Sequence, residues 1–284
     1  MTQFLTQVLN GVAFGMLLFL LAAGLSLIFG SMKILNLTHG SYYLLGGYIG
    51  YSVVNATGSF VLAAAIACAV VGVLGILMER FFLRHFHQDE LPQALLTFGF
   101  VFIFADICFL IWGGNPLTLP KPAPLARSID LGVTLFPTYR LLLIAVGAAI
   151  AAVLWWFLEQ TRLGAMVRAG VDDEETTRAI GINVSALFMA VYGAGAALAA
   201  LGGVLGGALV GVYPGADFEV LLLGFVVVIV GGLGSLRGAL FGALFVGLVD
   251  NFGKAYFPEF APFSMFLPMV LILTLRPYGL FGRQ

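Results

Sequence analysis

The feature that most constrains the fold of this chain is a succession of long apolar runs separated by short polar stretches. A helix needs about twenty apolar residues to cross the roughly 30 Å hydrocarbon core of a bilayer. Of the 284 residues, 61% are hydrophobic and 10% are charged, whereas soluble domains carry about 25% charged residues. Apolar runs such as 141–157 do not alternate with polar residues, as strands of a membrane β-barrel do. The sequence therefore predicts an all-α transmembrane bundle in one domain over residues 1–284.

We expect about 8–10 membrane segments, because nine runs qualify or nearly qualify as spanning helices. They are 8–29, 41–54, 60–78, 92–111, 141–157, 187–210, 220–230, 239–249 and 263–275. Three of them, 41–54, 220–230 and 239–249, are too short to span alone. Short, glycine-interrupted segments in both halves of a membrane protein indicate discontinuous helices near a binding site. The predicted fold is therefore a polytopic bundle that contains broken helices.

The first interruption, residues 36–40 (Asn-Leu-Thr-His-Gly), is a candidate for contact with a solute. Unwound backbone at membrane depth is tolerated only where it is buried in protein or lines a water-filled cavity. Asn36, Thr38 and the N-terminus of the following helix would suit a carboxylate, such as that of an amino acid. The alternative is that Asn36 and Thr38 only cap the next helix. His39 is interpreted as a hydrogen-bonded packing residue more readily than as a proton carrier.

The second interruption is residues 231–238 (GGLGSLRG), and an isolated acid, Asp106, lies within run 92–111. Small residues let helices approach closely, so 231–238 is either a packing element or a second unwound segment. An ionisable residue inside a membrane suggests function; Asp106 would bind an amino group, pair with another helix or stay protonated against a carbonyl. The candidate substrate pathway is Asn36, Thr38, His39, Gly40, Asp106, Gly231, Gly234 and Ser235.

The longest well-charged segment is 162–184. An apolar stripe of Ala165, Met166, Ala169 and Val171 precedes the acidic cluster 172–175, helix continues over 176–180, and Gly181 is a natural helix stop. The pattern predicts a short amphipathic helix that ends in a tight turn and lies in a groove of a soluble partner. The alternative is an ordinary solvated loop.

The distribution of basic residues predicts the orientation of the chain. If segment 162–184 is cytoplasmic, nine of the 13 Lys and Arg residues lie inside and only Lys121, Arg127, Arg140 and Lys254 lie outside. The C-terminus is then cytoplasmic and, with nine crossings, the N-terminus is external. Five prolines predict an extended, non-helical loop over 113–140. The acids Asp217, Glu219, Asp250 and Glu259 are expected on the external surface, facing water or a binding protein.

Several stretches resemble one family of transport proteins. RAGVDDEETTRAIGINV (168–184) is similar to the cytoplasmic EAA-type coupling loop of ABC importer permeases, in the form found in branched-chain amino acid permeases. The stretches 24–51 (GLSLIFGSMKILNLTHGSYYLLGGYIGY), 231–243 (GGLGSLRGALFGA) and 275–282 (LRPYGLFG) resemble the same family in the same order. The likeness is closest to LivH-type subunits. The family usually has Phe-Ala-His-Gly-Glu after the asparagine, whereas this chain has Leu-Thr-His-Gly-Ser at 37–41.

The resemblance implies a multi-pass permease subunit of a binding-protein-dependent importer in the bacterial inner membrane, carrying a branched-chain or other hydrophobic amino acid. It implies as partners a second, LivM-like permease subunit, two cytoplasmic ATPase subunits and a periplasmic solute-binding protein. ATP and Mg would be bound by the ATPase subunits, so this chain would bind no cofactor and would not be an enzyme. The implied ATPase contact comprises Arg168, Ala169, Asp172, Asp173, Glu174, Glu175, Ala179, Gly181 and Asn183. Related importers take urea, short amides or small aromatic carboxylates, which stay open as alternative substrates.

Other classes of function fit the sequence less well. The net charge of −1 and the lack of zinc-finger or P-loop patterns argue against a nucleic-acid partner. His85 and His87 lie near acids but lack an evident third ligand, so no metal site is expected. An ion-coupled secondary transporter should display a coupled pair of intramembrane charges, and only Asp106 is clearly intramembrane. A membrane hydrolase would need more convergent His and acidic residues.

Overall fold

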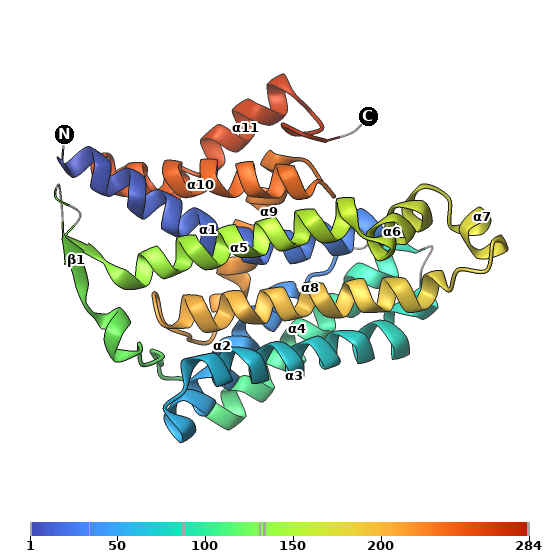
Figure 1. Ribbon diagram of the computed structural model, residues 1–284, viewed down its shortest axis with the longest axis horizontal. Coiled ribbons are helices and arrows are strands. Elements are labelled where there is room, and N and C mark those ends of the chain that lie inside the picture. Colours follow the sequence, from blue (N-terminus) through green and yellow to red (C-terminus); the bar gives the residue numbers. More distant parts are fainter. Residues whose placement is uncertain (1, 34, 87–88, 131, 133–134, 283–284) are drawn as a thin grey trace.

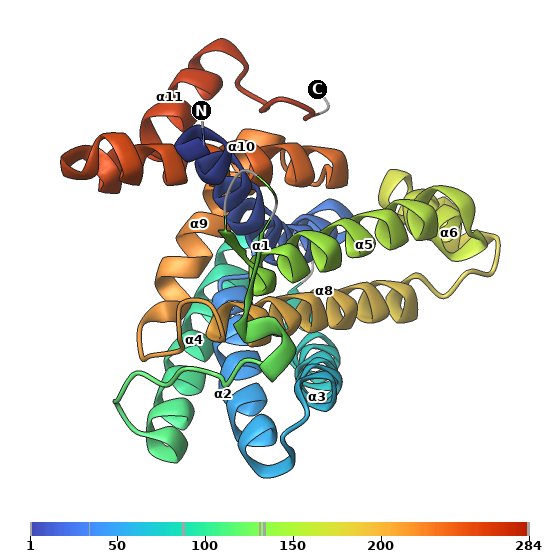
Figure 2. The same cartoon turned by 60° about the vertical axis from the view of Figure 1, so that its left-hand side comes forward.

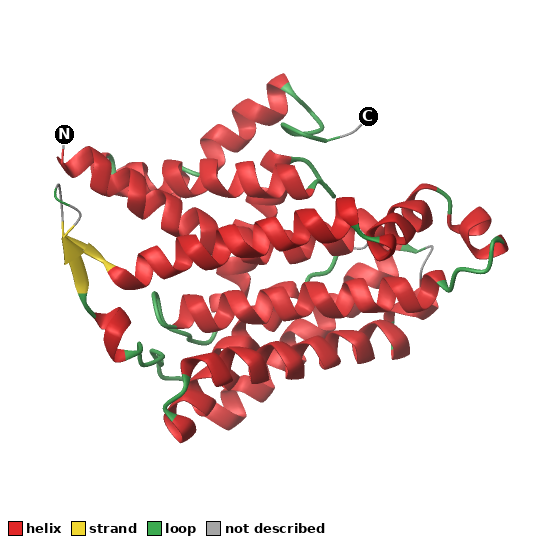
Figure 3. Cartoon of the chain, viewed as in Figure 1, coloured by secondary structure: helices red, strands yellow, loops and turns green. Residues whose placement is uncertain are grey.

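The computed structural model describes residues 2–33, 35–86, 89–130, 132 and 135–282. Each of the nine apolar runs occurs as a helix, which confirms the predicted helical membrane bundle (Figures 1 and 3). These helices are α1 (Thr2–Met32), α2 (His39–Thr57), α3 (Phe60–Phe81), α4 (Glu90–Trp112), α5 (Thr138–Gln160), α8 (Val184–Gly207), α9 (Ala216–Gly231), α10 (Leu236–Tyr256) and α11 (Phe266–Leu275). Two more, α6 (Arg162–Asp172) and α7 (Glu174–Ala179), lie between α5 and α8.

Six of the described helices are long and apolar enough to cross a membrane: α1, α3, α4, α5, α8 and α10. The prediction that run 239–249 is too short to span was wrong, because α10 has 21 residues. Polar side chains such as Asp250 and Lys254 continue this helix beyond its apolar centre. The prediction holds for run 220–230, since α9 has only 16 residues. The helix α2 has 19 residues but is not among the six candidate spans.

The helix α1 lies at the centre and joins two hydrophobic cores. One core contains residues of α1, α2, α3 and α8, with α8 between α1 and α3, and the other packs α1 against α9 and α10. Figure 2 shows that α2 crosses α5 and α8 steeply. The backbones of α2 and α8 touch: a Cβ added to Gly203 would lie 1.9 Å from the carbonyl oxygen of Tyr43. In contrast, α4 and α5 leave most of their apolar surface uncovered, as expected for helices that face lipid or another subunit.

The two ends of the bundle carry different elements (Figure 1). The N-terminus lies at the same end as the hairpin of β1 (Ser128–Asp130) and β2 (Leu135–Pro137), and α6 and α7 project from the opposite end. The described residues of segment 113–137 also include the 3₁₀ turn Ala123–Ala126 and a β-bridge from Leu117 to Val212, so the predicted extended loop is largely confirmed. Two other 3₁₀ turns are Leu83–Phe86 and Pro258–Phe263. Arg140 bonds Asn10 of α1, which places it at the N-terminal end.

Candidate functional site

The chain leaves helical structure after Met32 and re-enters it at His39, inside the bundle. The carbonyl oxygen of Leu21, in α1, lies 3.0 Å from His39 Nε2, and a carbonyl can only accept, so this nitrogen donates. Because α1 continues from Leu21 to Met32 at 1.5 Å per residue, α2 begins roughly 16 Å from the end of α1. The predicted interruption is therefore present, and it sits deep in the protein.

Asn36 and Thr38 bond each other instead of capping α2. Both side chains are fully buried. The backbone N–H of Thr38 donates to Asn36 Oδ1 at 3.1 Å, and the Thr38 hydroxyl donates to the same oxygen. Thr38 occupies the N-cap position but makes no side-chain cap hydrogen bond. The side chains of Asn36 and Thr38 therefore do not cap α2. Among the described residues, Asn36 Nδ2 has no hydrogen-bond partner.

The N-terminal turn of α9 meets the N-terminal turn of α2 at this level. A Cβ added to Gly40 would lie 2.2 Å from the carbonyl oxygen of Asp217, so the two backbones are in contact. The Asp217 side chain is only 2% exposed. Asp217 was expected at the external surface, and that prediction was wrong. Asp250, expected there as well, is also buried, where it pairs with Lys254 at 2.7 Å.

Unpaired polar atoms gather where α2 and α9 meet. Within the described part of the chain, both carboxylate oxygens of Asp217 and the hydroxyls of Ser41 and Tyr48 lack hydrogen-bond partners, as does Nδ1 of His39. Buried polar groups are normally satisfied, so a group of unsatisfied ones marks a place where a polar solute could bind. We call Asn36, Thr38, His39, Gly40, Ser41 and Asp217 the polar junction. Sequence reasoning missed Ser41 and Asp217; the available signal was the position of Asp217 just before the short apolar run 220–230.

The remaining pathway candidates lie elsewhere. Gly231 and Gly238 approach so closely that a Cβ on either would lie about 2 Å from the other's carbonyl oxygen, at 2.1 and 2.2 Å. Ser235 caps α10 by accepting from the N–H of Gly238 at 3.0 Å. A backbone contact joins Gly234 to Gly30 of α1. These contacts favour the packing interpretation of 231–238, while a role in the pathway stays a prediction.

The C-terminal motif covers the same turn. The backbone N–H groups of Leu280 and Phe281 donate to the carbonyls of Val230 and Gly231, both at 2.9 Å. The last carbonyls of α9 are thereby satisfied by the tail rather than by solvent. The family-like stretches 231–243 and 275–282 thus form one structural unit.

Asp106 is exposed on the surface of α4 and does not belong to the polar junction. A cavity of about 240 Å³ lies between α1, α5 and α10 and is lined by residues that include Phe19, Trp155, Arg237 and Leu240. Neither this cavity nor a smaller one beside Leu25 and Leu35 is lined by residues of the polar junction, and the backbones of α2 and α9 touch there. Among the described residues no three potential metal ligands converge, and His87 lies outside them.

The charged segment 162–184 forms two helices, not the single helix predicted. The backbone of Asp173 is extended (φ −153°, ψ 98°) and separates α6 from α7. Of the predicted apolar stripe, Ala165 and Val171 are exposed, and Met166 and Ala169 are half-buried. The buried face is Gly164, Val167 and Gly170. Hydropathy overlooks glycine, whose bare backbone here lets α6 lie against α5 and α8.

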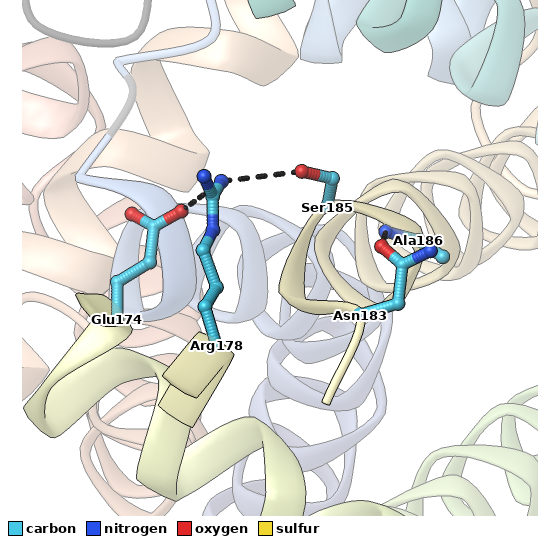
Figure 4. A network of polar contacts seen from close by, with 5 residues as sticks. All are labelled: Glu174, Arg178, Asn183, Ser185 and Ala186. Carbon is cyan, nitrogen blue, oxygen red and sulfur yellow. Dashed lines mark hydrogen bonds and ion pairs between the residues drawn. The ribbon is translucent and has the colours of Figure 1, made fainter. Parts of the chain in front are cut away.

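Side-chain caps fix the shape of this projection (Figure 4). Arg178 bonds Glu174 at 2.5 Å and the Ser185 hydroxyl at 3.2 Å, while Asn183 caps α8 by accepting from the N–H of Ala186. Asp173 caps α7 through Thr176, whose N–H and hydroxyl both donate to the carboxylate, and these bonds hold the pKa of Asp173 below its ordinary value. The predicted stop at Gly181 is confirmed by its φ of +90°. The segment is therefore an ordered elbow rather than a loose loop.

Most of the implied ATPase-contact residues are exposed on this elbow. They are Arg168, Asp172, Asp173, Glu174, Glu175, Ala179, Gly181 and Asn183, and Ala169 is half-buried. Apolar side chains lie among them, including Ile180 at 70% exposure. An exposed, mixed apolar and charged surface on a fixed scaffold is suited to binding another protein.

Comparison with known proteins assigns residues 7–275 to the family described as branched-chain amino acid transport system / permease component. The chain is 28% identical to the high-affinity branched-chain amino acid transport system permease protein LivH of Escherichia coli K12, over 99% of this chain and 96% of that protein. It is 27% identical to BraD of Pseudomonas aeruginosa, the corresponding permease protein, with the same coverage. The ribose import permease protein RbsC of Escherichia coli K12 is 27% identical over 82% of this chain and 73% of its own length. PsaBC from Streptococcus pneumoniae shares the fold, with a TM-score of 0.51 at 14% identity over 94% of this chain and 89% of that one.

Proposed function

The chain belongs to the family of branched-chain amino acid transport system permease components, and on that premise we propose that it is the membrane subunit of a binding-protein-dependent ABC importer. The observation that carries the proposal is the ordered elbow α6–α7, which projects from one end of the bundle with its charged residues exposed. In this proposal two ATPase subunits bind the elbow and a solute-binding protein docks at the opposite end. This chain translocates the solute, and ATP and Mg are bound by the ATPase subunits.

The packing of the elbow supports a mechanical role. The helix α6 lies against α5, α8 and α1, and α7 lies against α6 and α8. The helix α8 in turn is in backbone contact with α2, which begins at the polar junction. A displacement of the elbow would thus reach the polar junction through two rigid helices. The proposal places the elbow in the cytoplasm, and with it the C-terminus, while the N-terminus is external.

A second permease subunit is part of the proposal, and α4 supports it. Asp106 lies in the middle of α4 on an exposed face that is otherwise apolar, with Phe102, Ile103 and Leu110 nearby. An ionisable side chain that faces lipid at this depth is costly, and such groups normally face protein or a water-filled space. We therefore infer that this face of α4 is covered by the second permease subunit, or lines a pathway between the two subunits.

The proposed solute is a branched-chain or other hydrophobic amino acid. The curated relatives LivH and BraD are named for branched-chain amino acids. A ribose permease is also among the relatives, so the solute requires its own test. Calorimetric titration of the cognate binding protein with leucine, urea, short amides and aromatic carboxylates separates the candidates, and tight binding of leucine alone is the expected result.

Reconstitution tests the transport mechanism. Vesicles that contain both permease subunits, the ATPase subunits and the binding protein should accumulate leucine only when ATP is supplied to the ATPase side. Vesicles without the ATPase subunits are the control. Uptake driven by an ion gradient in those control vesicles would favour an ion-coupled secondary transporter and would refute the importer proposal.

A further inference from the structure

Asp217 is the least compensated acid in the described part of the chain. It is 2% exposed, neither carboxylate oxygen has a hydrogen-bond partner, and no described Lys, Arg or His forms an ion pair with it. The groups that lie near the carboxylate are the Ser41 hydroxyl and the backbone N–H groups of Asp217 and Phe218, and the Phe218 N–H also donates to the Gly215 carbonyl at 3.2 Å. These donors are neutral, so they leave the charge of Asp217 without a counter-charge. A buried charge is normally paired or coordinated. Asp217 therefore has an unmet requirement for a cationic donor.

The position of Asp217 changes which group of a zwitterionic solute we expect to bind at the polar junction: the ammonium group instead of the carboxylate. Helix N-termini attract anions, and the N-termini of α2 and α9 meet at Gly40 and Asp217. The chain's own carboxylate already occupies the place that these two helix ends create for an anion. A solute carboxylate would be repelled there. The group that the polar junction can accept is a cation that donates hydrogen bonds.

An aromatic surface adjoins this carboxylate. Phe218 follows Asp217 directly and packs against Phe98 and Phe102 of α4, with ring centroids 6.5 and 6.3 Å away, while Phe98 and Phe102 lie 5.0 Å apart. All three side chains are more than a third exposed. We call Phe98, Phe102 and Phe218 the aromatic wall. Because Phe218 follows Asp217 in α9, the aromatic wall begins one residue from the carboxylate, and its exposed rings would accept an aliphatic side chain.

We propose that Asp217 binds the ammonium group of the transported amino acid while the aromatic wall contacts its apolar side chain. This inference rests on the proposed transport function and adds which end of the solute each part of the site binds. Ser41 and Tyr48, whose hydroxyls are unpartnered, supply further hydrogen bonds to the ammonium group. In the present conformation the carboxylate is enclosed, so the solute reaches it when α2 and α9 separate.

A pair of substitutions in one helix tests the inference in the reconstituted complex. Asp217→Asn removes the charge and keeps the shape. The matched control is Glu219→Gln, because Glu219 is an exposed acid of the same helix that bonds the Tyr213 hydroxyl at 2.7 Å. ATP-driven leucine uptake should fall at least about tenfold in Asp217→Asn, the usual effect of losing a hydrogen bond to a charged group, while ATP hydrolysis continues. Glu219→Gln should retain uptake. Equal uptake in both variants would overturn the inference.

Chemical labelling of the unmodified complex provides a test that does not depend on the folding of a variant. A hydrophobic carbodiimide labels buried carboxyl groups, and mass spectrometry locates the label. Leucine delivered by the binding protein should slow labelling of Asp217, whereas 4-methylpentanoate, which is leucine without its amino group, should not. Labelling of Asp217 that is absent, or that leucine does not change, contradicts the inference.

The two proposals fail in different ways. Wild-type uptake of leucine reports the transport function, and the difference between Asp217→Asn and Glu219→Gln reports the ammonium site. If the wild-type complex carries another amine, the same pair of variants is measured with that amine. A complex that carries only solutes without an amino group would refute the ammonium site and leave the ATP-driven importer standing.

Discussion

The contact between α2 and α8 is close enough that one added methyl group should force the helices apart. A Cβ at position 203 would lie 1.9 Å from the Tyr43 carbonyl oxygen and 2.8 Å from the Gly47 nitrogen. Such contacts are essentially never shorter than 3.0 Å, so Gly203→Ala requires a displacement of roughly 1.1 Å. Overpacking of this kind costs about 1–3 kcal/mol. The adjacent Gly202 has ordinary space, with its nearest contact at 3.5 Å.

Gly202→Ala is therefore the matched control. Both substitutions gain the same helix propensity, about 0.5–1 kcal/mol, so the difference between them isolates the steric cost. We expect the purified Gly203→Ala complex to unfold at a lower temperature than the Gly202→Ala complex. Because α8 links the elbow to α2, Gly203→Ala should also lower the number of solute molecules carried per ATP. If the two variants have the same melting temperature and the same coupling ratio, the proposed close contact between α2 and α8 is wrong.

Three other predictions concern the elbow and the tail. Deletion of residues 172–175 should abolish co-purification of the ATPase subunits while membrane insertion survives, and normal assembly would contradict the proposed contact. Because hydrogen bonds from Thr176 lower the pKa of Asp173 below 3.8, capping of α7 is present above pH 3.8 and is lost as the pH falls through the lowered value. The protection of α7 amides, measured as exchange relative to the intrinsic rate at each pH, should fall below that point, whereas in Asp173→Asn it should stay constant there; identical protection profiles would argue against the cap. Phe281→Ala removes a ring stacked on α10 at 5.3 Å and should cost about 1 kcal/mol in thermal unfolding, whereas Tyr278→Ala, 59% exposed, should not.

The membrane helices could be predicted from sequence because hydropathy depends on each residue's own side chain. The run 8–29, for example, belongs to α1, Thr2–Met32. The interruption at 36–40 was also predictable, since a polar stretch inside apolar sequence must be satisfied by protein or water. The bounds were less accurate where polar residues extend a helix. Asp250 and Lys254 pair with each other at one end of α10. Because this pair forms only when the two residues are one helical turn apart, a hydropathy pattern does not detect it.

Burial could not be predicted where glycine or tertiary contact decides it. The buried face of α6 includes Gly164 and Gly170, which hydropathy does not count as apolar. The sequence around Asp217 resembles an external loop, because the short run 220–230 suggests that the membrane begins after it. In the structure the chain enters the bundle before α9 starts, so Asp217 is enclosed by α2. Such re-entry depends on contacts between segments distant in sequence.

The arrangement of α2, α8 and α9 suggests how force at the elbow would open the polar junction. The helix α8 packs mainly on α1, α2 and α3, whereas the principal neighbours of α9 are α1, α2, α10 and α11. A displacement of α8 would therefore move α2 more directly than α9. The contact between α2 and α9 at Gly40 is made by backbone atoms, so a small separation would lose little buried side-chain area there. That separation would expose the Asp217 carboxylate, which is why we place solute binding at the contact of α2 and α9 and the driving force at α6 and α7.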